Sequence, residues 1–439
     1  MRTKIIISCC FLALLGMSLT ACSKHAAAGQ TTTPPPDTAL VNFHHLDALY
    51  TPVAFPGGTA AAGVFIYSQY PDYHPVDATG EGYTCVDDVS RAVLAYLRSG
   101  KFPSDTAVRS KVYNLLSFVV QMQSTNGYFY NFLTTANTIN MFGPTSINNP
   151  DWWSWRALQT LTEAGPLIKT LNPSLFALTD AAVHKGVGRL MTDFASLPRT
   201  TTQSNGVTVP TWLPAGSGSD QSSVILQALI NYCKATPDTA IVSFIRKLAD
   251  GIVTMQQGDA THFPYDAFLS WSNTWHAYGN VQAYALMQAG IFLQDTLYTN
   301  RAMAEVDNFY PWLLANGLKV DFAIGVTGRV IQTLSENSYA QIAYGIEPMV
   351  FAAAGAYAAT GQQKYADIAG HLAAWLLGAN DGGVVMYSIA TGVCDDGLSA
   401  GGQANLNSGA ESTIEALLTL EEVEVYPAIR AALEKYKKP

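Results

Sequence analysis

Paired carboxylates near apolar segments are the residues of this chain best suited to chemistry. Asp87-Asp88 opens an apolar run, Asp395-Asp396 precedes a glycine, and Glu411 begins another apolar run. Two adjacent carboxylates repel each other, and this repulsion raises the pKa of one of them. A carboxyl group with a raised pKa acts as a general acid, while a second one stays ionised as base or nucleophile. The candidate catalytic residues are therefore Asp87, Asp88, Glu411 and Asp396.

Aromatic and hydrogen-bonding residues form a second group of candidates. Sugar rings pack their C–H faces on aromatic planes, and polar side chains bind their hydroxyl groups. We expect at least one of Trp153, Trp271 and Trp275 to be exposed, and Trp152 to pack in the core. The expected substrate-binding residues are Trp153, Arg156, Asp220, Trp275, His276 and Tyr130. Each has an alternative explanation, because acids also cap helices and aromatic or histidine side chains also fill cores.

Two kinds of helical segment alternate along the chain and would position these residues. Segments that are apolar almost all round are predicted at 87–98, 152–164, 220–234, 275–290, 341–360 and 410–423. Segments with one charged face follow them at 105–123, 173–195, 238–257, 298–316, 363–378 and 426–437. A helix that is apolar on every side is buried, whereas an amphipathic helix lies at the surface. The pattern predicts six helical hairpins, with an inner and an outer ring.

The register of the inner helices predicts which side chains share one level. Four residues each stand nine positions before a leucine: Asp88, Trp152, Asp220 and Glu411. The links that lead into inner helices are long, so one face carries both the long loops and the helix N-termini. Because the first and last hairpins meet when a ring closes, Asp88 and Glu411 are expected to face each other. A carboxyl separation of about 6.5–9.5 Å would indicate an inverting glycosidase, and about 5–5.5 Å a retaining one.

Two motifs resemble those of known toroidal proteins. The segment 85–92, Cys-Val-Asp-Asp-Val-Ser-Arg-Ala, resembles the DDNARAL-type motif of toroid domains fused to some group-1 glycosyltransferases, but has Val89-Ser90 in place of Asn-Ala. The segment 407–413, Asn-Ser-Gly-Ala-Glu-Ser-Thr, resembles their GAEST-type motif. With the hairpin pattern, these motifs resemble the six-hairpin glycosidase superfamily. That resemblance implies an all-α (α/α)6 toroid with its active site in a funnel at the N-terminal ends of the inner helices.

Composition and missing motifs exclude several other functions. The 439-residue chain has a net charge of −9 and no run of Lys or Arg, which excludes a nucleic-acid partner. It has no CxxC motif or Cys/His cluster with zinc spacing, and no nucleotide-binding motif, so we expect neither a metal nor a cofactor. The favoured function is a glycoside hydrolase whose partner is an oligosaccharide or polysaccharide. The alternatives are a polysaccharide lyase of the same fold and a non-catalytic glycan-binding toroid.

The N-terminus indicates export and lipid anchoring. Arg2 and Lys4 precede an apolar stretch, which ends in Leu19-Thr20-Ala21-Cys22 and resembles a bacterial lipobox. Residues 1–21 are therefore predicted to be a signal peptide, Cys22 the lipidated residue, 22–40 a flexible tether and 41–439 the toroid domain. The expected location is the bacterial cell envelope, at the outer membrane facing the periplasm. A disulfide between Cys85 and Cys394 is a further hypothesis, since both precede neighbouring inner helices.

Overall fold

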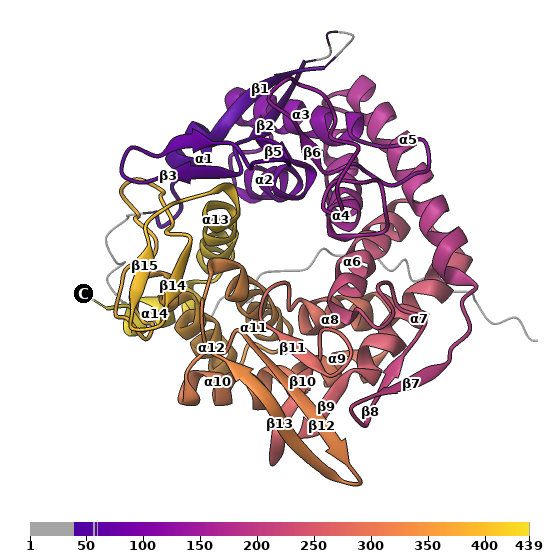
Figure 1. The fold of residues 1–439 in the computed structure, drawn as a ribbon, viewed down its shortest axis with the longest axis vertical. Helices are drawn as coiled ribbons and strands as arrows, with labels where there is room; N and C mark the ends of the chain where they lie inside the picture. Colours follow the sequence, from indigo (N-terminus) through magenta and orange to yellow (C-terminus); the bar gives the residue numbers. More distant parts are fainter. Residues whose placement is uncertain (1–38, 56–57, 59, 439) are drawn as a thin grey trace, which may run out of the picture. The chain divides into compact units, whose positions relative to one another are not determined.

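Six helices form a closed inner ring in the described part of the chain (Figure 1). Each contacts the next, and the last contacts the first. They are α2 (Val86–Arg98), α4 (Trp152–Ile168), α6 (Ser219–Ala235), α8 (Gln282–Leu293), α11 (Glu347–Thr360) and α13 (Ala410–Val425). The structure is a computed structural model that describes residues 39–55, 58 and 60–438. Cys22 and the predicted signal peptide and tether, except for residues 39–40, lie outside these ranges.

An outer helix packs against each inner helix (Figure 1). The outer helices are α3 (Thr106–Gln121), α5 (Pro173–Leu190), α7 (Thr239–Thr254), α9 (Thr296–Ala304), α12 (Gln363–Ala373) and α14 (Pro427–Tyr436). Short helical pieces extend this set: α1 (His44–Leu49), η1 (Met191–Ala195), η2 (Glu305–Phe309), α10 (Tyr310–Asn316), η3 (Ala343–Gly345) and η4 (Ala374–Leu376). The inner–outer alternation confirms the predicted hairpins. None of the helices in the described ranges is long and apolar enough to cross a membrane.

The acids in the first turns of α2, α6 and α13 differ from the aspartates that cap other helices, including Asp151 at the start of inner helix α4. Asp105 caps α3 by accepting hydrogen bonds from two backbone amides, and Asp238 caps α7 in the same way. In the inner ring, Gly218 and Gly409 precede α6 and α13 without a side-chain cap, and the Cys85 sulfur accepts the bond at the start of α2. Asp88, Asp220 and Glu411 therefore lie within the first helical turn and are not N-cap residues. Capping does not explain why acids stand at these positions.

Antiparallel strands occupy the links between helices. The two-stranded pairs are β1 (Tyr50–Ala54) with β2 (Ala60–Val64), β3 (Tyr67–Gln69) with β4 (His74–Val76), β5 (Thr84–Cys85) with β6 (Phe132–Leu133), β7 (Thr201–Ser204) with β8 (Val207–Pro210), β9 (Gln256–Asp259) with β10 (His262–Phe268), and β14 (Gly397–Ser399) with β15 (Gln403–Asn405). A three-stranded sheet has the order β11 (Thr274–His276), β12 (Asp321–Thr327), β13 (Val330–Asn337).

Two predicted inner helices begin later than expected. The fourth starts at Gln282 and not at 275, because residues 274–276 pair with β12 as strand β11. The fifth starts at Glu347 and not at 341, because a 3-10 turn at 343–345 precedes it. Pro348 stands in the first turn of α11, where its missing N–H breaks no helical bond. Both changes place loop residues at the ring centre, where helix had been predicted.

Candidate active site

A cavity of about 630 Å³ opens at the N-terminal ends of the inner helices. Its lining includes all four residues that the register places at one level, Asp88, Trp152, Asp220 and Glu411. Acidic groups from α2, α6 and α13 therefore share one space with aromatic side chains. We call this space the funnel cavity.

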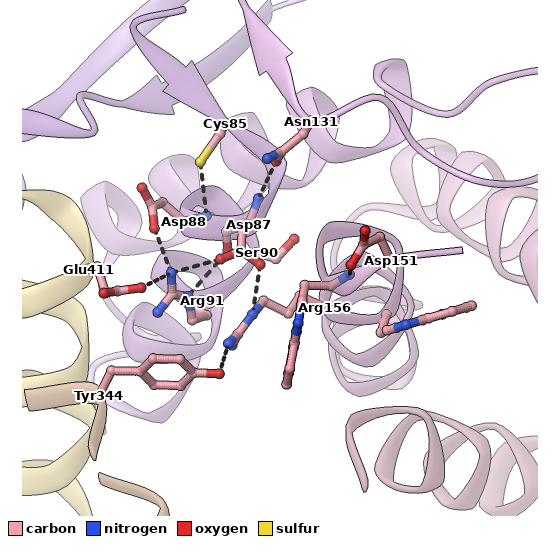
Figure 2. Close-up of polar contacts among 12 residues, drawn as sticks. Cys85, Asp87, Asp88, Ser90, Arg91, Asn131, Asp151, Arg156, Tyr344 and Glu411 are labelled. Carbon is pink, nitrogen blue, oxygen red and sulfur yellow. Dashed lines mark hydrogen bonds and ion pairs between the residues drawn. The ribbon is translucent and has the colours of Figure 1, made fainter. Parts of the chain in front are cut away.

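Arg91 is the centre of a charge cluster between the first and last inner helices (Figure 2). Its Nη2 lies 2.9 Å from Asp87 Oδ2, 2.7 Å from Asp88 Oδ1 and 3.2 Å from Glu411 Oε2. Its Nη1 is paired with Glu415. The Arg91 side chain is only 3% exposed, so these four carboxyl groups replace the water that a buried guanidinium loses. Together, Arg91 and the carboxyl groups of Asp87, Asp88, Glu411 and Glu415 are called the Arg91 cluster.

Helical spacing explains how α2 builds its half of this cluster. Asp87 and Asp88 precede Arg91 by four and three residues, so all three side chains lie on one face of the helix. Glu411 and Glu415 have the same spacing of four on α13, the helix that closes the ring against α2. Each helix therefore presents a charged stripe to the other, and the guanidinium joins the two stripes.

Arg156 and Tyr344 complete the floor of the funnel cavity. Arg156 Nε lies 2.7 Å from Asp87 Oδ1, and its Nη2 donates to the Tyr344 hydroxyl (Figure 2). Both guanidinium groups also lie over the Tyr344 ring, at 5.3 Å for Arg91 and 4.9 Å for Arg156. Below this floor is a chamber of about 40 Å³, lined in part by Glu347 and Glu415. Burial, together with the nearby Glu415 charge, raises the pKa of Glu347 to about 8.

Two carboxyl groups of the funnel cavity have strongly raised pKa values. Burial raises the pKa of Asp88 to about 7; Arg91 opposes the shift, whereas Asp87 and Glu411 reinforce it. Burial also raises the pKa of Asp220 to about 7. Asp220 is 2% exposed and accepts a bond from the Gln221 amide at 2.7 Å. Near neutral pH, each of these groups is therefore close to half protonated, the state in which a carboxyl group can give a proton to a substrate.

An aromatic wall lines the same cavity as the acids. Trp152, Trp153, Trp271, His276 and Tyr278 all line the funnel cavity. The His276 ring lies 4.5 Å from Tyr278 and 5.5 Å from Trp271, and burial lowers its pKa, which favours the neutral imidazole. The wall offers flat apolar faces beside a neutral hydrogen-bonding group, as a sugar ring requires.

Three carboxylates of the Arg91 cluster lie close enough together to be tested as a cation site. One oxygen each from Asp87, Asp88 and Glu411 lies within 4.8 Å of the others. The Nη2 atom of Arg91, however, is within hydrogen-bonding distance of all three groups. A guanidinium group therefore holds these oxygens together, and the donor set fits an ion-pair cluster better than a metal centre.

Most of the predicted site residues meet in the funnel cavity. Its lining includes Asp87, Asp88, Glu411, Asp396, Trp153, Arg156, Asp220 and His276. Asp396 has a second, structural contact: its Oδ1 accepts 2.7 Å bonds from the Gly409 amide and the Ser412 hydroxyl, at the start of α13. Trp271 is 39% exposed, which confirms that one of the three named tryptophans is accessible.

Three expectations need correction, and a fourth, for Trp152, needs an addition. Trp275 is 0% exposed and stacks on Phe322 at 5.2 Å, because strand β11 turns it into the core. Tyr130 is half-buried, packs against the core and is not part of the cavity lining. Trp152 is half-buried: it packs against the core, as expected, and it also lines the cavity. Cys85 and Cys394 are both buried free thiols, so the proposed disulfide is absent.

Three residues of the floor and cluster were not predicted. Arg91 stands within the first motif, and its spacing from Asp87 and Asp88 was the available signal. Glu415 stands one turn after Glu411 and offered a similar signal. No sequence signal pointed to Tyr344, because this residue reaches the ring centre through a 3-10 turn inside a segment predicted as helix.

Comparisons with known proteins identify the fold. No family model matches the chain, and no curated protein matches its sequence. The cellobiose 2-epimerase from Bacillus thermoamylovorans B4167 has 12% identity and a TM-score of 0.56, covering 83% of this chain and 92% of its own. A D-mannose isomerase has 14% identity and a TM-score of 0.59, covering 90% of this chain and 100% of its own. A sugar epimerase from a ruminal bacterium has 9% identity and a TM-score of 0.56, and the match covers 83% of this chain and 92% of the epimerase.

The fold is the (α/α)6 toroid. This confirms the all-α class and the double ring of helical hairpins expected from the sequence. At these identities the likeness concerns the fold alone, so the chemistry of the toroid must be argued from its own side chains.

Proposed function

We propose that this protein is a carbohydrate-active enzyme that hydrolyses a glycosidic bond with a pair of carboxyl groups. The observation that carries the proposal is the funnel cavity, in which Asp88, with a pKa raised to about 7, lies near Glu411 and shares the space with an aromatic wall. The sugar enzymes that share the fold support a carbohydrate substrate. The toroid thus provides an acid, a second carboxylate and stacking surfaces in one space.

In this proposal Asp88 is the general acid. Its Oδ1 is held by Arg91, which leaves Oδ2 to carry the proton that passes to the leaving glycosidic oxygen. Glu411 is the nucleophile, because its side chain is 44% exposed and the cluster places its oxygen within 4.8 Å of an Asp88 oxygen. An oxygen-to-oxygen distance within this limit fits retaining enzymes, whose carboxyl groups are about 5–5.5 Å apart, better than inverting ones, which need about 6.5–9.5 Å. After Glu411 displaces the leaving group, ionised Asp88 takes a proton from the water that releases the sugar.

The test is cleavage of a broad oligosaccharide panel by residues 23–439, with products resolved chromatographically. Asp88→Asn and Glu411→Gln should lose cleavage while melting close to wild type, because Arg91 keeps other carboxyl partners in each variant. Asp77→Asn, an exposed acid after β4, is the matched control and should cleave normally. Full activity in either site variant would contradict the assigned roles. Proton NMR of the first product should show the anomer of the substrate, and the opposite anomer would exclude Glu411 as nucleophile.

Sugar epimerisation or isomerisation is a second candidate. It is favoured by His276, a neutral imidazole on the cavity wall, and by the epimerase and isomerase names of the structures that share the fold. The same panel separates the two reactions, because an isomerised sugar keeps its mass whereas hydrolysis adds water. A new isomer that disappears in His276→Asn, without any cleavage, would replace the hydrolase proposal.

We further propose that the protein is exported and anchored by lipid on Cys22 at the outer membrane, facing the periplasm. The basic, apolar and lipobox-like parts of residues 1–22 support this proposal. Cys22→Ala expressed at full length should lose incorporation of labelled fatty acid and leave the membrane fraction. Equal incorporation in Cys22→Ala and wild type would contradict the anchor.

A further inference from the structure

A second cavity lies beside the funnel cavity. It has a volume of about 490 Å³, and its lining includes His44, His45, Tyr73, Val393 and Asp395. Asp395 lines this cavity, whereas the next residue, Asp396, lines the funnel cavity. A single backbone segment therefore separates the two spaces. We call the second space the side cavity.

We propose that the side cavity binds distal sugar residues of a neutral oligosaccharide whose reacting bond lies in the funnel cavity. The proposal rests on the proposed function and extends it from a reaction to a substrate class. It requires a fixed ridge between the cavities, stacking surfaces that lead across it, and polar groups at the far end that are free to bind hydroxyls.

The ridge is built from the β3–β4 hairpin and the segment that leads into α13. Ser68 Oγ donates to the Ser408 carbonyl at 2.6 Å, and the Tyr70 amide donates to Asn407 Oδ1 at 3.1 Å. The Asp396 amide donates to the Asn407 carbonyl at 2.8 Å. These bonds tie the hairpin to the loop that carries both aspartates, so the two cavities keep a fixed relation.

Three tyrosines of the hairpin lead from one cavity to the other. Tyr67 lines the funnel cavity and Tyr73 lines the side cavity. Tyr70 stands between them in the chain and is 50% exposed, and its ring lies 6.2 Å from that of Tyr73. Tyr67 begins strand β3, and Tyr70 directly follows its last residue, Gln69, so both tyrosines belong to the same hairpin. Exposed aromatic faces in such a series are suited to stacking against sugar rings.

Asp395 supplies the polar end of the path. Among the described residues its carboxylate has no hydrogen bond or ion pair, although the residue is half-buried. A carboxylate in this state has its acceptor positions free for ligand hydroxyls. Tyr73 also lines the side cavity, and its φ of +54° is set by its place at the end of the turn between β3 and β4.

Charge selects the kind of glycan. Asp395 in the side cavity and Asp87, Asp88 and Glu411 in the funnel cavity would repel the carboxylates of a uronate chain along its whole length. The two arginines that line the funnel cavity, Arg91 and Arg156, are already paired with protein carboxylates. A neutral chain of more than two sugars therefore fits the two cavities better than an acidic polysaccharide.

The experiment measures how affinity depends on chain length. Titration calorimetry is done on Asp88→Asn, which blocks turnover, with ladders of two to six residues of neutral β-1,4-linked glucan, mannan and xylan. For the glycan series that binds, the affinity should rise at least tenfold from the disaccharide to the hexasaccharide. Adding Tyr70→Ala or Asp395→Asn should reduce that ratio to about one or two. Adding Asp77→Asn, an acid of the same hairpin region that lines neither cavity, should leave the ratio unchanged.

The possible results separate this proposal from the proposed function. A length dependence that survives both side-cavity variants would overturn the side cavity as a sugar site and leave the hydrolase proposal intact. Cleavage by wild type, together with an affinity that does not depend on chain length, would also overturn the side cavity as a sugar site and leave the hydrolase proposal intact. Calcium that stabilises the protein thermally through Asp395, without glycan binding there, would make the side cavity a cation site and overturn the proposal. No binding or cleavage of any glycan would overturn both.

Discussion

The two sides of the funnel cavity hold acids with similar pKa values but different surroundings. On the α2–α13 side, burial raises the pKa of Asp88 to about 7 against the opposing charge of Arg91. On the α6 side, burial raises the pKa of Asp220 to about 7, and only backbone hydrogen bonds oppose it. The pKa of Asp88 should therefore respond to its neighbours, whereas that of Asp220 depends on its enclosure. Because the pKa of Asp88 responds to nearby charge, Asp88 is better placed than Asp220 to change protonation during a reaction.

Removing each acid in turn gives the largest expected effect. Asp88→Asn should lower kcat by about 10²–10⁴-fold, the range for a missing general acid. Asp220→Asn should lower kcat less than tenfold and act mainly on KM, because in this proposal Asp220 binds substrate. Initial rates on the cleaved oligosaccharide measure both. A larger loss of kcat in Asp220→Asn than in Asp88→Asn would mean that Asp220, and not Asp88, is the general acid.

Removing the charge of Arg91 should destabilise only the α2–α13 side. Arg91→Leu leaves the Asp87, Asp88 and Glu415 carboxyl groups without their shared cation, and breaking a buried ion pair costs about 3–5 kcal/mol. Arg246→Leu is the control, because Arg246 pairs with Asp295 at 2.7 Å on the exposed surface. A surface pair contributes at most about 1 kcal/mol. Urea unfolding measures both, and equal losses would mean that the cluster is not a buried network.

The pH dependence of stability should distinguish the two acids. Because folding raises the pKa of Asp220 from 3.8 to about 7, its contribution to stability is complete below pH 3.8 and is lost as pH rises through 7. The side-chain amide introduced by Asp220→Asn does not titrate, so the free energy of unfolding of this variant should rise relative to wild type between about pH 4 and 8, by at most about 4 kcal/mol. Urea unfolding at a series of pH values measures the difference. Asp88→Asn should gain less stability over this pH range, because Arg91 loses one of its carboxyl partners in that variant. A constant difference for Asp220→Asn across this range would mean that Asp220 ionises normally.

The aromatic wall on the Asp220 side should give the smallest effect. Trp271 follows Ser270, whose carbonyl accepts the Ser219 amide at 2.8 Å, and its exposed ring is expected to stack on substrate. Trp271→Ala should raise KM by a few-fold at constant kcat, which corresponds to about 0.5–1.5 kcal/mol of stacking. Trp275→Ala, in the core beside it, should instead lower stability by about 3–5 kcal/mol. Steady-state kinetics with thermal melts separate the two, and an unchanged KM in Trp271→Ala would remove that ring from the site.

Local patterns in the sequence predict the rings and one side of the site well. Helices α4, α6 and α13 begin within one residue of their predicted starts, because an apolar run follows a polar start in each case. The position of Glu411 relative to Asp88 followed from ring closure and helical register. In the Arg91 cluster, the i to i+3 and i+4 spacings were visible, but the meeting of Arg91 with α13 depends on tertiary packing.

The other side of the site depends on contacts between distant segments. Trp275 points into the core because residues 274–276 pair with 321–323, a strand that no local pattern connects to them. Tyr344 reaches the floor because a 3-10 turn delays the start of α11. Hydrophobic periodicity treats both segments as helix, so it misplaces side chains whose backbone is set by distant pairing.

The closure of the ring also has a consequence for how the protein is made. Arg91 and Glu411 belong to the first and last inner helices and are 320 residues apart. A ribosome therefore completes five inner helices before the acids of α13 exist, and Arg91 lacks two of its partners until then. Contacts so distant in sequence form late and slowly. Docking of the last hairpin thus closes the ring and assembles the charge cluster in one event, so a nascent chain has no complete site until α13 has been made.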